Sequence, residues 1–278
     1  MQKEVDQKNV KEMETCSNAD LLPFILVRIN NSEKVYEFHL DIGARKTTIF
    51  TTLAEELGIE VDKNLTQTCH SALSEMQIPT ALIKSLSVGS EVLINLEVFV
   101  ANMRKAGYTL KAVGALGYDF LKNYRVHVNF PKKTINFVKD DAKALESLIN
   151  FNYFNDTHLV SIKANINDSG PYWFVLDTGA SGNIMTASLA EKLNIASDEI
   201  IGEAVTCSGR SPLKLAQANK FETFFKTVYN MDFATMNLDH FNAKGLQKIG
   251  GILGHPFLKE FELVIDYPHQ KLGLLKTN

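Results

Sequence analysis

Two aspartates in this 278-residue chain, Asp41 and Asp177, lie in the same local sequence, which occurs twice. Each follows a short apolar segment and precedes a glycine and an alanine after one intervening residue. Because glycine lets the backbone turn sharply, each copy delivers one carboxylate at the end of a strand. Two copies predict two halves of a single site, where carboxylates that share a proton can act as acid and base.

The repetition extends well beyond the two loops. Residues 189–195 match residues 53–59 at five of seven positions, with the same offset along the chain as the two aspartates. The apolar segments that end at Gly117 and Gly254 are offset by only one position more. Offsets that drift so little over a whole half indicate duplication of one structural unit.

Signals for strands, turns and helices recur in the same order in each half. Residues 24–29 and 35–40 flank an Asn-Asn-Ser turn, which predicts a hairpin that ends at Asp41. Residues 52–58 predict a short helix with a threonine cap, and the polar residues 64–80 predict a projecting hairpin. Further strands are expected at 81–88, 92–101, 126–130, 134–137, 158–166 and 173–176, and a helical turn at 142–148.

Length and composition suit two domains of similar size. With 45% hydrophobic and 22% charged residues, the chain resembles an ordinary globular protein that can form a core. We expect a mainly β protein with a mobile N-terminal arm at 1–19, a first lobe at 20–137, a linker at 138–157 and a second lobe at 158–278.

Charge and cysteine content narrow the partners and the compartment. A net charge of −3 provides no electrostatic footprint for nucleic acid, so none is expected as a partner. Three cysteines, Cys16, Cys69 and Cys207, cannot form a disulfide framework and favour a reducing compartment. The chain has no apolar segment long enough for a membrane span, and its first residues lack the apolar core of a secretory signal. The default expectation is the cytoplasm, with a secreted or periplasmic location left open.

Other chemistries fit the sequence poorly. The glycines of 113–117 and 249–254 do not form a nucleotide-binding loop, and close backbone packing beneath the aspartates explains them better. No Gly-x-Ser-x-Gly motif is present. The seven histidines show no zinc-type spacing and are expected to be structural or solvent-facing, so we expect no metal and no cofactor.

The repeated motif resembles that of the retropepsin-like aspartic proteases of the pepsin clan. Residues 177–180, Asp-Thr-Gly-Ala, and 252–254, Ile-Leu-Gly, match the family pattern, while 41–44, Asp-Ile-Gly-Ala, with 115–117, Ala-Leu-Gly, match it with one substitution. The resemblance covers about residues 21–275. It implies two pseudo-symmetric acid-protease lobes, each a closed β-barrel-like domain with one or two short helices, in a single-chain tandem whose active site is complete within a monomer.

The resemblance also implies roles for individual residues. Asp41 and Asp177 would be the catalytic pair that activates a water for attack on a peptide bond. The residues that support their loops would be Gly43, Ala44, Thr178, Gly179, Ala180, Gly117 and Gly254. Two flaps would close over an extended polypeptide substrate, with Cys69, His70, Ser71 and Ala72 in one and Cys207, Ser208, Gly209 and Arg210 in the other.

Two departures within the loops affect the expected activity. Ile42 stands where the family has a threonine that ties the loops together, so the first lobe lacks one hydroxyl. Ala44 and Ala180 replace the serine usual in pepsins, and by resemblance the pH optimum is expected near about 5 to 7. Two alternatives remain open: a weak or inactive homologue that binds peptides in the same cleft, and a structural lobe pair with no ligand.

Overall fold

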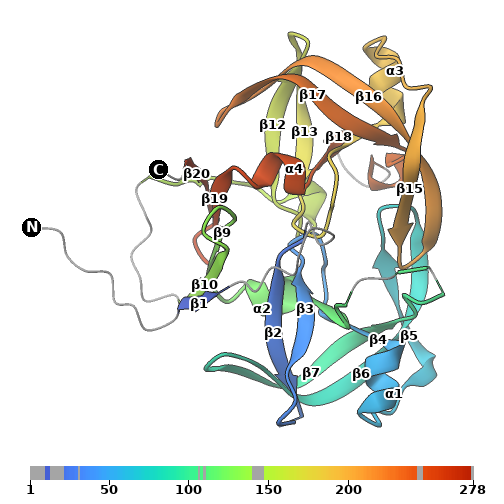
Figure 1. Cartoon of the computed structure of the whole chain (residues 1–278), viewed down its shortest axis with the longest axis vertical. Helices are drawn as coiled ribbons and strands as arrows, with labels where there is room; N and C mark the ends of the chain where they lie inside the picture. Colours follow the sequence, from blue (N-terminus) through green and yellow to red (C-terminus); the bar gives the residue numbers. More distant parts are fainter. Residues whose placement is uncertain are drawn as a thin grey trace, which may run out of the picture.

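The computed structural model describes residues 10–12, 22–30, 32–105, 107–108, 111–139, 147–242 and 247–276. The protein is mainly β, with two near-closed mixed sheets of seven strands, each accompanied by short helices, and a third sheet of six strands. Figure 1 shows the two seven-stranded units one above the other and the third sheet to one side of them. In the part of the chain that the structure describes, no helix combines the length and apolar character needed to cross a membrane.

The first lobe is the seven-stranded sheet of the N-terminal half together with α1 (Thr51–Glu56) and α2 (Tyr118–Leu121). Its strands, in spatial order, are β2 (Phe24–Ile29), β3 (Tyr36–Leu40), β8 (Gly114–Leu116), β4 (Thr48–Phe50), β7 (Glu91–Ala101), β6 (Glu75–Val88) and β5 (Asp62–His70). An additional pairing of β2 with β6 nearly closes the sheet on itself. The hairpin predicted to lead into Asp41 is confirmed as β2 and β3.

The second lobe repeats this arrangement with α3 (Ala187–Lys192) and α4 (His255–Leu258). Its strands, in the equivalent spatial order, are β12 (Ser161–Ile166), β13 (Ser169–Leu176), β18 (Ile249–Leu253), β14 (Ile184–Thr186), β17 (Thr227–Met236), β16 (Gly209–Thr223) and β15 (Ile200–Thr206). The pairing of β12 with β16 matches that of β2 with β6. The predicted duplication of one fold unit is therefore confirmed.

Equivalent phenylalanines fill the two lobe interiors. Phe38 on β3 and Phe174 on β13 are both fully buried. A side chain at Gly114 or Gly251 would overlap these rings, since an added Cβ would lie 2.5 Å and 2.6 Å from a ring carbon, respectively. Close packing beneath the aspartate loops thus explains these glycines, as the sequence predicted.

The third sheet, called here the shared sheet, draws strands from both halves of the chain. Its order is β1 (Val10–Glu12), β10 (Thr134–Val138), β9 (Arg125–Asn129), β19 (Phe261–Asp266), β20 (Lys271–Lys276) and β11 (Ile149–Asn150). At the β9–β19 junction, Arg125 Nε lies 2.7 Å from Asp266 Oδ2, and both side chains are buried. The predicted strands at 126–130 and 134–137 are present, but they join strands of the other half.

Some local predictions differ from the structure. The helix at 52–58 is present as α1, but the predicted threonine cap is wrong: Phe50 is the N-cap residue and offers no side-chain hydrogen bond. In the second lobe the equivalent residue, Thr186, does cap α3 by accepting from the Leu189 N–H. Within the predicted N-terminal arm, the described residues form β1, which is too short to leave a periodic signal. The helical turn predicted at 142–148 lies mostly outside the described residues.

Candidate active site

Each candidate aspartate lies at the carboxyl end of a central strand. Asp41 follows β3, and its N–H donates to the Leu116 carbonyl on β8 at 3.1 Å. Asp177 follows β13, and its N–H donates to the Leu253 carbonyl on β18 at 3.0 Å. Each pair of strands is parallel, so both strands of a pair end on the same side of the sheet. Asp41 therefore follows β3 where Gly117 follows β8, and Asp177 follows β13 where Gly254 follows β18.

Backbone N–H groups hold each carboxylate in place. The N–H groups of Gly43 and Ala44 both donate to Oδ1 of Asp41 at 2.9 Å. In the second lobe, the N–H of Gly179 donates to Oδ1 of Asp177 at 2.7 Å, and Ala180 contributes a further backbone hydrogen bond. These donors orient the side chains and favour their ionised forms.

The two loops meet across the lobe boundary, and each glycine packs against the carboxylate of the other lobe. A Cβ added to Gly43 would lie 2.6 Å from Cγ of Asp177, and one added to Gly179 would lie 2.7 Å from Cγ of Asp41. After burial, the charge of Asp41 is the main cause that raises the pKa of Asp177, as expected for two carboxyl groups held close together. The structure therefore brings the two predicted aspartates into one site, and only glycine fits beside them.

Burial and mutual repulsion make it costly for both carboxyls to ionise. Burial, followed by the charge of Asp41, raises the pKa of Asp177 well above its ordinary value. Burial also raises the pKa of Asp41, against the opposing backbone donors of Ala44 and Gly43. The pair consequently retains one proton at a higher pH than two solvent-exposed aspartates would.

Thr178 ties the two loops together from one side. Its hydroxyl accepts a hydrogen bond from the Ile42 N–H at 3.1 Å and donates to the Leu40 carbonyl. Ile42 is equivalent in position but has no hydroxyl, and its side chain is 1% exposed in the apolar core. The lattice across the lobe boundary is therefore asymmetric, as predicted from the substitution at this position.

The support glycines lie directly beneath the aspartate loops. A Cβ on Gly117 would lie 3.0 Å from the Ala44 carbonyl oxygen, and one on Gly254 would lie 2.4 Å from the Ala180 carbonyl oxygen. The carbonyls of Ala44 and Ala180 in turn accept from the N–H groups of the residues that follow these glycines, Tyr118 and His255, both at 2.9 Å.

Two further side chains, Thr47 and Asn183, support the aspartate loops and were not predicted from the sequence. The Thr47 hydroxyl accepts from the Gly117 N–H at 3.2 Å, and Asn183 Oδ1 accepts from the Gly254 N–H at 3.1 Å. Their offset along the chain equals that of the two aspartates, so they occupy equivalent positions in the two lobes. A comparison of residue types alone does not reveal this equivalence, because one is a threonine and the other an asparagine. Thr47 is held further by Asp119, whose Oδ1 accepts from both its N–H and its hydroxyl.

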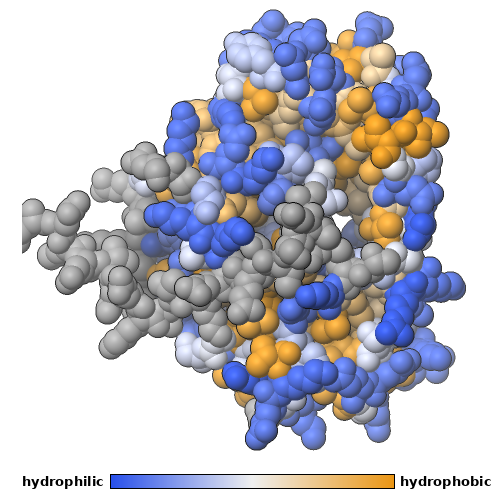
Figure 2. Space-filling model, viewed as in Figure 1, coloured by the Kyte–Doolittle hydropathy of each residue, from blue (hydrophilic) through white to orange (hydrophobic). Residues whose placement is uncertain are grey.

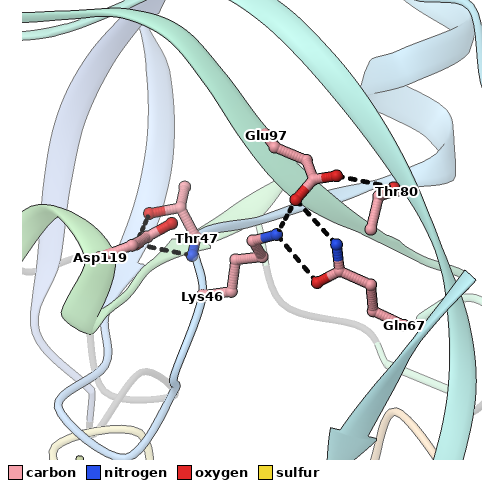
Figure 3. A network of polar contacts seen from close by, with 6 residues as sticks. All are labelled: Lys46, Thr47, Gln67, Thr80, Glu97 and Asp119. Carbon is pink, nitrogen blue, oxygen red and sulfur yellow. Dashed lines mark hydrogen bonds and ion pairs between the residues drawn. The ribbon is translucent and has the colours of Figure 1, made fainter.

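A polar network in the first lobe connects the aspartate loop to the base of the β5–β6 hairpin (Figure 3). Lys46, next to Thr47, donates to Glu97 Oε2 and to Gln67 Oε1. Gln67 and Thr80 also donate to the Glu97 carboxylate. Hydrogen bonding to Lys46 is the main cause that lowers the pKa of Glu97. The equivalent of Lys46 in the second lobe is Gly182, so this connection is specific to the first lobe.

A histidine of the second half supports the first aspartate loop. Nε2 of His158 lies 2.9 Å from the Gly43 carbonyl and donates to it. Burial lowers the pKa of His158 to about 4, so the ring is neutral at physiological pH. The sequence predicted that this histidine would be structural or solvent-facing. In the structure it is buried and has a structural role.

The predicted flap residues lie on two hairpins that reach toward each other. The first flap is the β5–β6 hairpin and the second flap is the β15–β16 hairpin, which meet on the side of the molecule away from the shared sheet (Figure 1). Ser71 Oγ and Ser208 Oγ lie 2.5 Å apart, and Cys69 Sγ and Cys207 Sγ lie 3.9 Å apart. The structure therefore brings together residues of the two predicted flaps.

Each flap packs against the opposite lobe. Ala72 and Leu73 of the first flap contact an apolar cluster of the second lobe, and the Ser71 carbonyl accepts from Nε2 of His240 at 3.0 Å. Cys207 of the second flap contacts a first-lobe cluster formed by Phe50, Ile78, Phe99 and Ala101. The two flaps are therefore closed in this structure.

Two other flap residues, His70 and Arg210, form ion pairs or hydrogen bonds. His70 pairs with Glu75 at 3.0 Å, and Arg210 pairs with Glu203 at 3.0 Å and donates to the Gly107 carbonyl at 3.4 Å. Gly209 has a φ of 134°, a backbone conformation that favours glycine at the tip of the hairpin. Hydrophobic side chains reach the surface near β15 and β16 (Figure 2), and β15 contributes the exposed Ile200 and Ile201.

The comparison with protein families matches both lobes. A family model described as aspartyl protease matches residues 25–120 and, separately, residues 162–257. Each match contains one aspartate loop, one flap and one glycine support strand. No curated protein sequence matches the chain.

Proposed function

This chain belongs to the aspartyl protease family, with two retropepsin-like domains in tandem, and we propose that it is an endopeptidase that uses Asp41 and Asp177. One observation carries the proposal: each carboxylate packs against the glycine of the other loop, so the two lie together at the junction of the lobes. Paired carboxyl groups at the junction of two lobes are suited to acid–base chemistry on a bound water.

The proposed reaction needs one proton on the pair. The ionised carboxylate takes a proton from a water held between the two groups, and the water oxygen attacks the carbonyl carbon of the peptide bond. The protonated carboxyl donates its proton to the carbonyl oxygen as the tetrahedral intermediate forms. Collapse of this intermediate breaks the C–N bond. The departing nitrogen takes the proton that the first carboxylate received from water, and a hydroxyl of the intermediate returns its proton to the other carboxylate, which restores the singly protonated pair. The raised pKa values of both carboxyls favour this singly protonated state under mildly acidic conditions.

The proposed substrate is a polypeptide in extended conformation, bound between the carboxylates and the flaps. Both flap hairpins offer backbone groups to such a strand, which gives affinity with limited sequence selectivity. The flap tips now occupy apolar clusters of the opposite lobes. Substrate entry would open these contacts, and apolar substrate side chains could take their place.

A peptide-binding module is the second candidate function, and Ile42 is the observation that favours it. Ile42 has no hydroxyl, so the first loop makes no counterpart of the two hydrogen bonds by which the Thr178 hydroxyl reaches across to it. If the site is held too loosely for catalysis, the same cleft and flaps would still bind an extended peptide.

Cleavage of an unfolded protein substrate distinguishes these functions. The wild type, Asp41→Asn and Asp177→Asn would be assayed from about pH 3 to about pH 8. Asp168→Asn is the matched control, because Asp168 is exposed, pairs with Lys220 and lies in the turn before β13, at the opposite end of that strand from Asp177. We expect cleavage by the wild type and the control, and at least a hundredfold loss, on the order of a general acid or base contribution, in either site variant. Peptide binding without cleavage at any pH would instead support the binding module.

A further inference from the structure

The two flaps carry a matched pair of thiols. Cys69 is on β5 and Cys207 directly follows β15, and their offset along the chain is close to that of the two aspartates, in line with the duplication. Their Sγ atoms lie 3.9 Å apart, across the junction of the two lobes. Both residues are partly exposed, so a small reagent can reach them.

The surroundings of the thiols hold the flap tips against each other. The hydroxyls of Ser71 and Ser208 are in contact beside them. Cys69 and Cys207 both pack against the same apolar cluster of the first lobe. The charge of Asp41 also acts on both thiols, which places the pair close to the proposed catalytic groups.

The two thiols are chemically unequal. The hydrogen bond with Cys69 lowers the pKa of Cys207, while the same hydrogen bond and burial raise the pKa of Cys69. Cys207 is therefore the better source of a thiolate, which is the nucleophile in thiol–disulfide exchange. A disulfide has an S–S bond of about 2.0 Å, so its formation requires the sulfurs to approach by roughly 2 Å. Small movements of the two hairpin tips, together with rotation of the cysteine side chains, can bring the sulfurs this much closer.

We propose that Cys69 and Cys207 form a reversible disulfide that locks the two flaps together over the aspartates. The inference rests on the proposed function in one respect: the cleft it closes is the one through which a polypeptide substrate would enter. Because the bond joins hairpins of different lobes, it prevents them from separating, and the reduced pair permits opening.

The oxidant is a low-molecular-weight disulfide of the glutathione class. The Cys207 thiolate attacks one sulfur of this disulfide, which forms a mixed disulfide and releases one small thiolate. Cys69 then loses its proton, and its thiolate attacks Sγ of Cys207, releasing the second small thiol. The protein loses two protons and two electrons, and the small disulfide is reduced to two thiols. A dithiol reductant reverses the sequence.

The test uses the full chain with Cys16→Ser, which removes the cysteine outside the described residues. The protein is treated with glutathione disulfide or with dithiothreitol, and the bond is located by intact mass and peptide mapping. Binding of a statine-type peptide and cleavage of an unfolded protein are measured in both redox states. The matched variants Cys69→Ser and Cys207→Ser remove one thiol each.

We expect the oxidised monomer to lose two hydrogens at the Cys69–Cys207 pair. We also expect it to bind peptide and cleave substrate at least about tenfold more slowly, with recovery after reduction. The single-serine variants cannot form the bond, so their intact mass should show no loss of two hydrogens, and neither rate should show the drop of about tenfold when each variant is compared with its own reduced form. If the bond forms only between molecules, or if the oxidised monomer binds peptide as fast as the reduced one, the inference is overturned. If the bond slows peptide binding but neither redox state cleaves, the lock stands and the proposed protease activity fails.

Discussion

The Thr178 hydroxyl and the Ile42 backbone nitrogen, 3.1 Å apart, connect the two aspartate loops across the lobe boundary. The same hydroxyl donates to the Leu40 carbonyl, so one side chain joins the second loop to two backbone groups of the first. Because Thr178 is 1% exposed, water cannot readily replace it in either hydrogen bond. The alignment of the two carboxylates therefore depends strongly on this one residue.

Replacing Thr178 with valine tests this dependence. Thr178→Val keeps the shape of the side chain but leaves a buried N–H and a buried carbonyl without their partner. We expect a loss of about 1 to 3 kcal/mol in the free energy of unfolding, together with reduced cleavage, measured by denaturant titration and peptide assay. Ile42→Val is the matched control, since it removes one methylene at the equivalent position and no hydrogen bond, and is expected to cost only about 0.5 to 1.5 kcal/mol. Equal losses of activity in the two variants would contradict the role of the hydroxyl.

Asp177 should destabilise the fold when it is ionised. Since its folded-state pKa is raised above the unfolded value, its contribution to stability is present at low pH and is lost as the pH rises through the raised pKa. Asp177→Asn keeps a neutral group at every pH, so this variant should melt at a higher temperature than the wild type near pH 7. Each kcal/mol recovered corresponds to about 2 to 4 °C for a chain of this size.

The difference between the Asp177→Asn and wild-type melting temperatures should disappear below about pH 4, where an ordinary aspartate is also protonated. Asp168→Asn, at an exposed position, should show no comparable gain near pH 7. A melting temperature of Asp177→Asn that is lower than that of the wild type at both pH values would contradict this account.

The proposed activity should have an optimum near about pH 5 to 7. Both carboxyls have raised pKa values, so the singly protonated pair should persist to less acidic conditions than an unperturbed pair. Ala180→Ser introduces a hydroxyl that can donate to a carboxylate and favour its ionised form, and should move the acidic limb of the rate profile down by about one pH unit. Ala187→Ser is an exposed control that should leave the profile unchanged. A wild-type optimum below about pH 3 would rule out the predicted range.

Glu97 should affect substrate binding through the base of the first flap. Its carboxylate accepts from Lys46 beside the aspartate loop, and from Gln67 and Thr80 on the flap strands (Figure 3). Glu97→Gln removes the ion pair and should raise KM by about two- to fivefold, consistent with the small energy of a partly exposed pair. The exposed Glu60→Gln is the control. A loss confined to kcat, with KM unchanged, would contradict a role in the flap.

The sequence predicted the lobes and the aspartate loops well because the duplication preserved their residue types. The hairpin into Asp41 and the helices α1 and α3 follow from local patterns of apolar residues, which a single segment contains. The shared sheet was not predicted. Its central pairing joins Val126 to Ile265, and no local pattern encodes a partner so distant along the chain. Thr47 and Asn183 were not predicted, because each accepts a hydrogen bond from a support glycine but the two side chains differ in type.

The shared sheet makes the two lobes depend on each other during synthesis. In it, β9 of the first half pairs with β19 of the second, and the buried pair of Arg125 and Asp266 forms at that junction. A growing chain that has completed the first lobe still lacks β19, the neighbour of β9, and the buried pair of Arg125 and Asp266 cannot form until Phe261–Asp266 has been translated. The strand that leads to Asp177 also needs β18 (Ile249–Leu253) as its neighbour, so the two carboxylates can be held together only after most of the chain has been made. If the chain has the proposed protease activity, an incomplete chain on the ribosome would not yet cleave itself or other proteins.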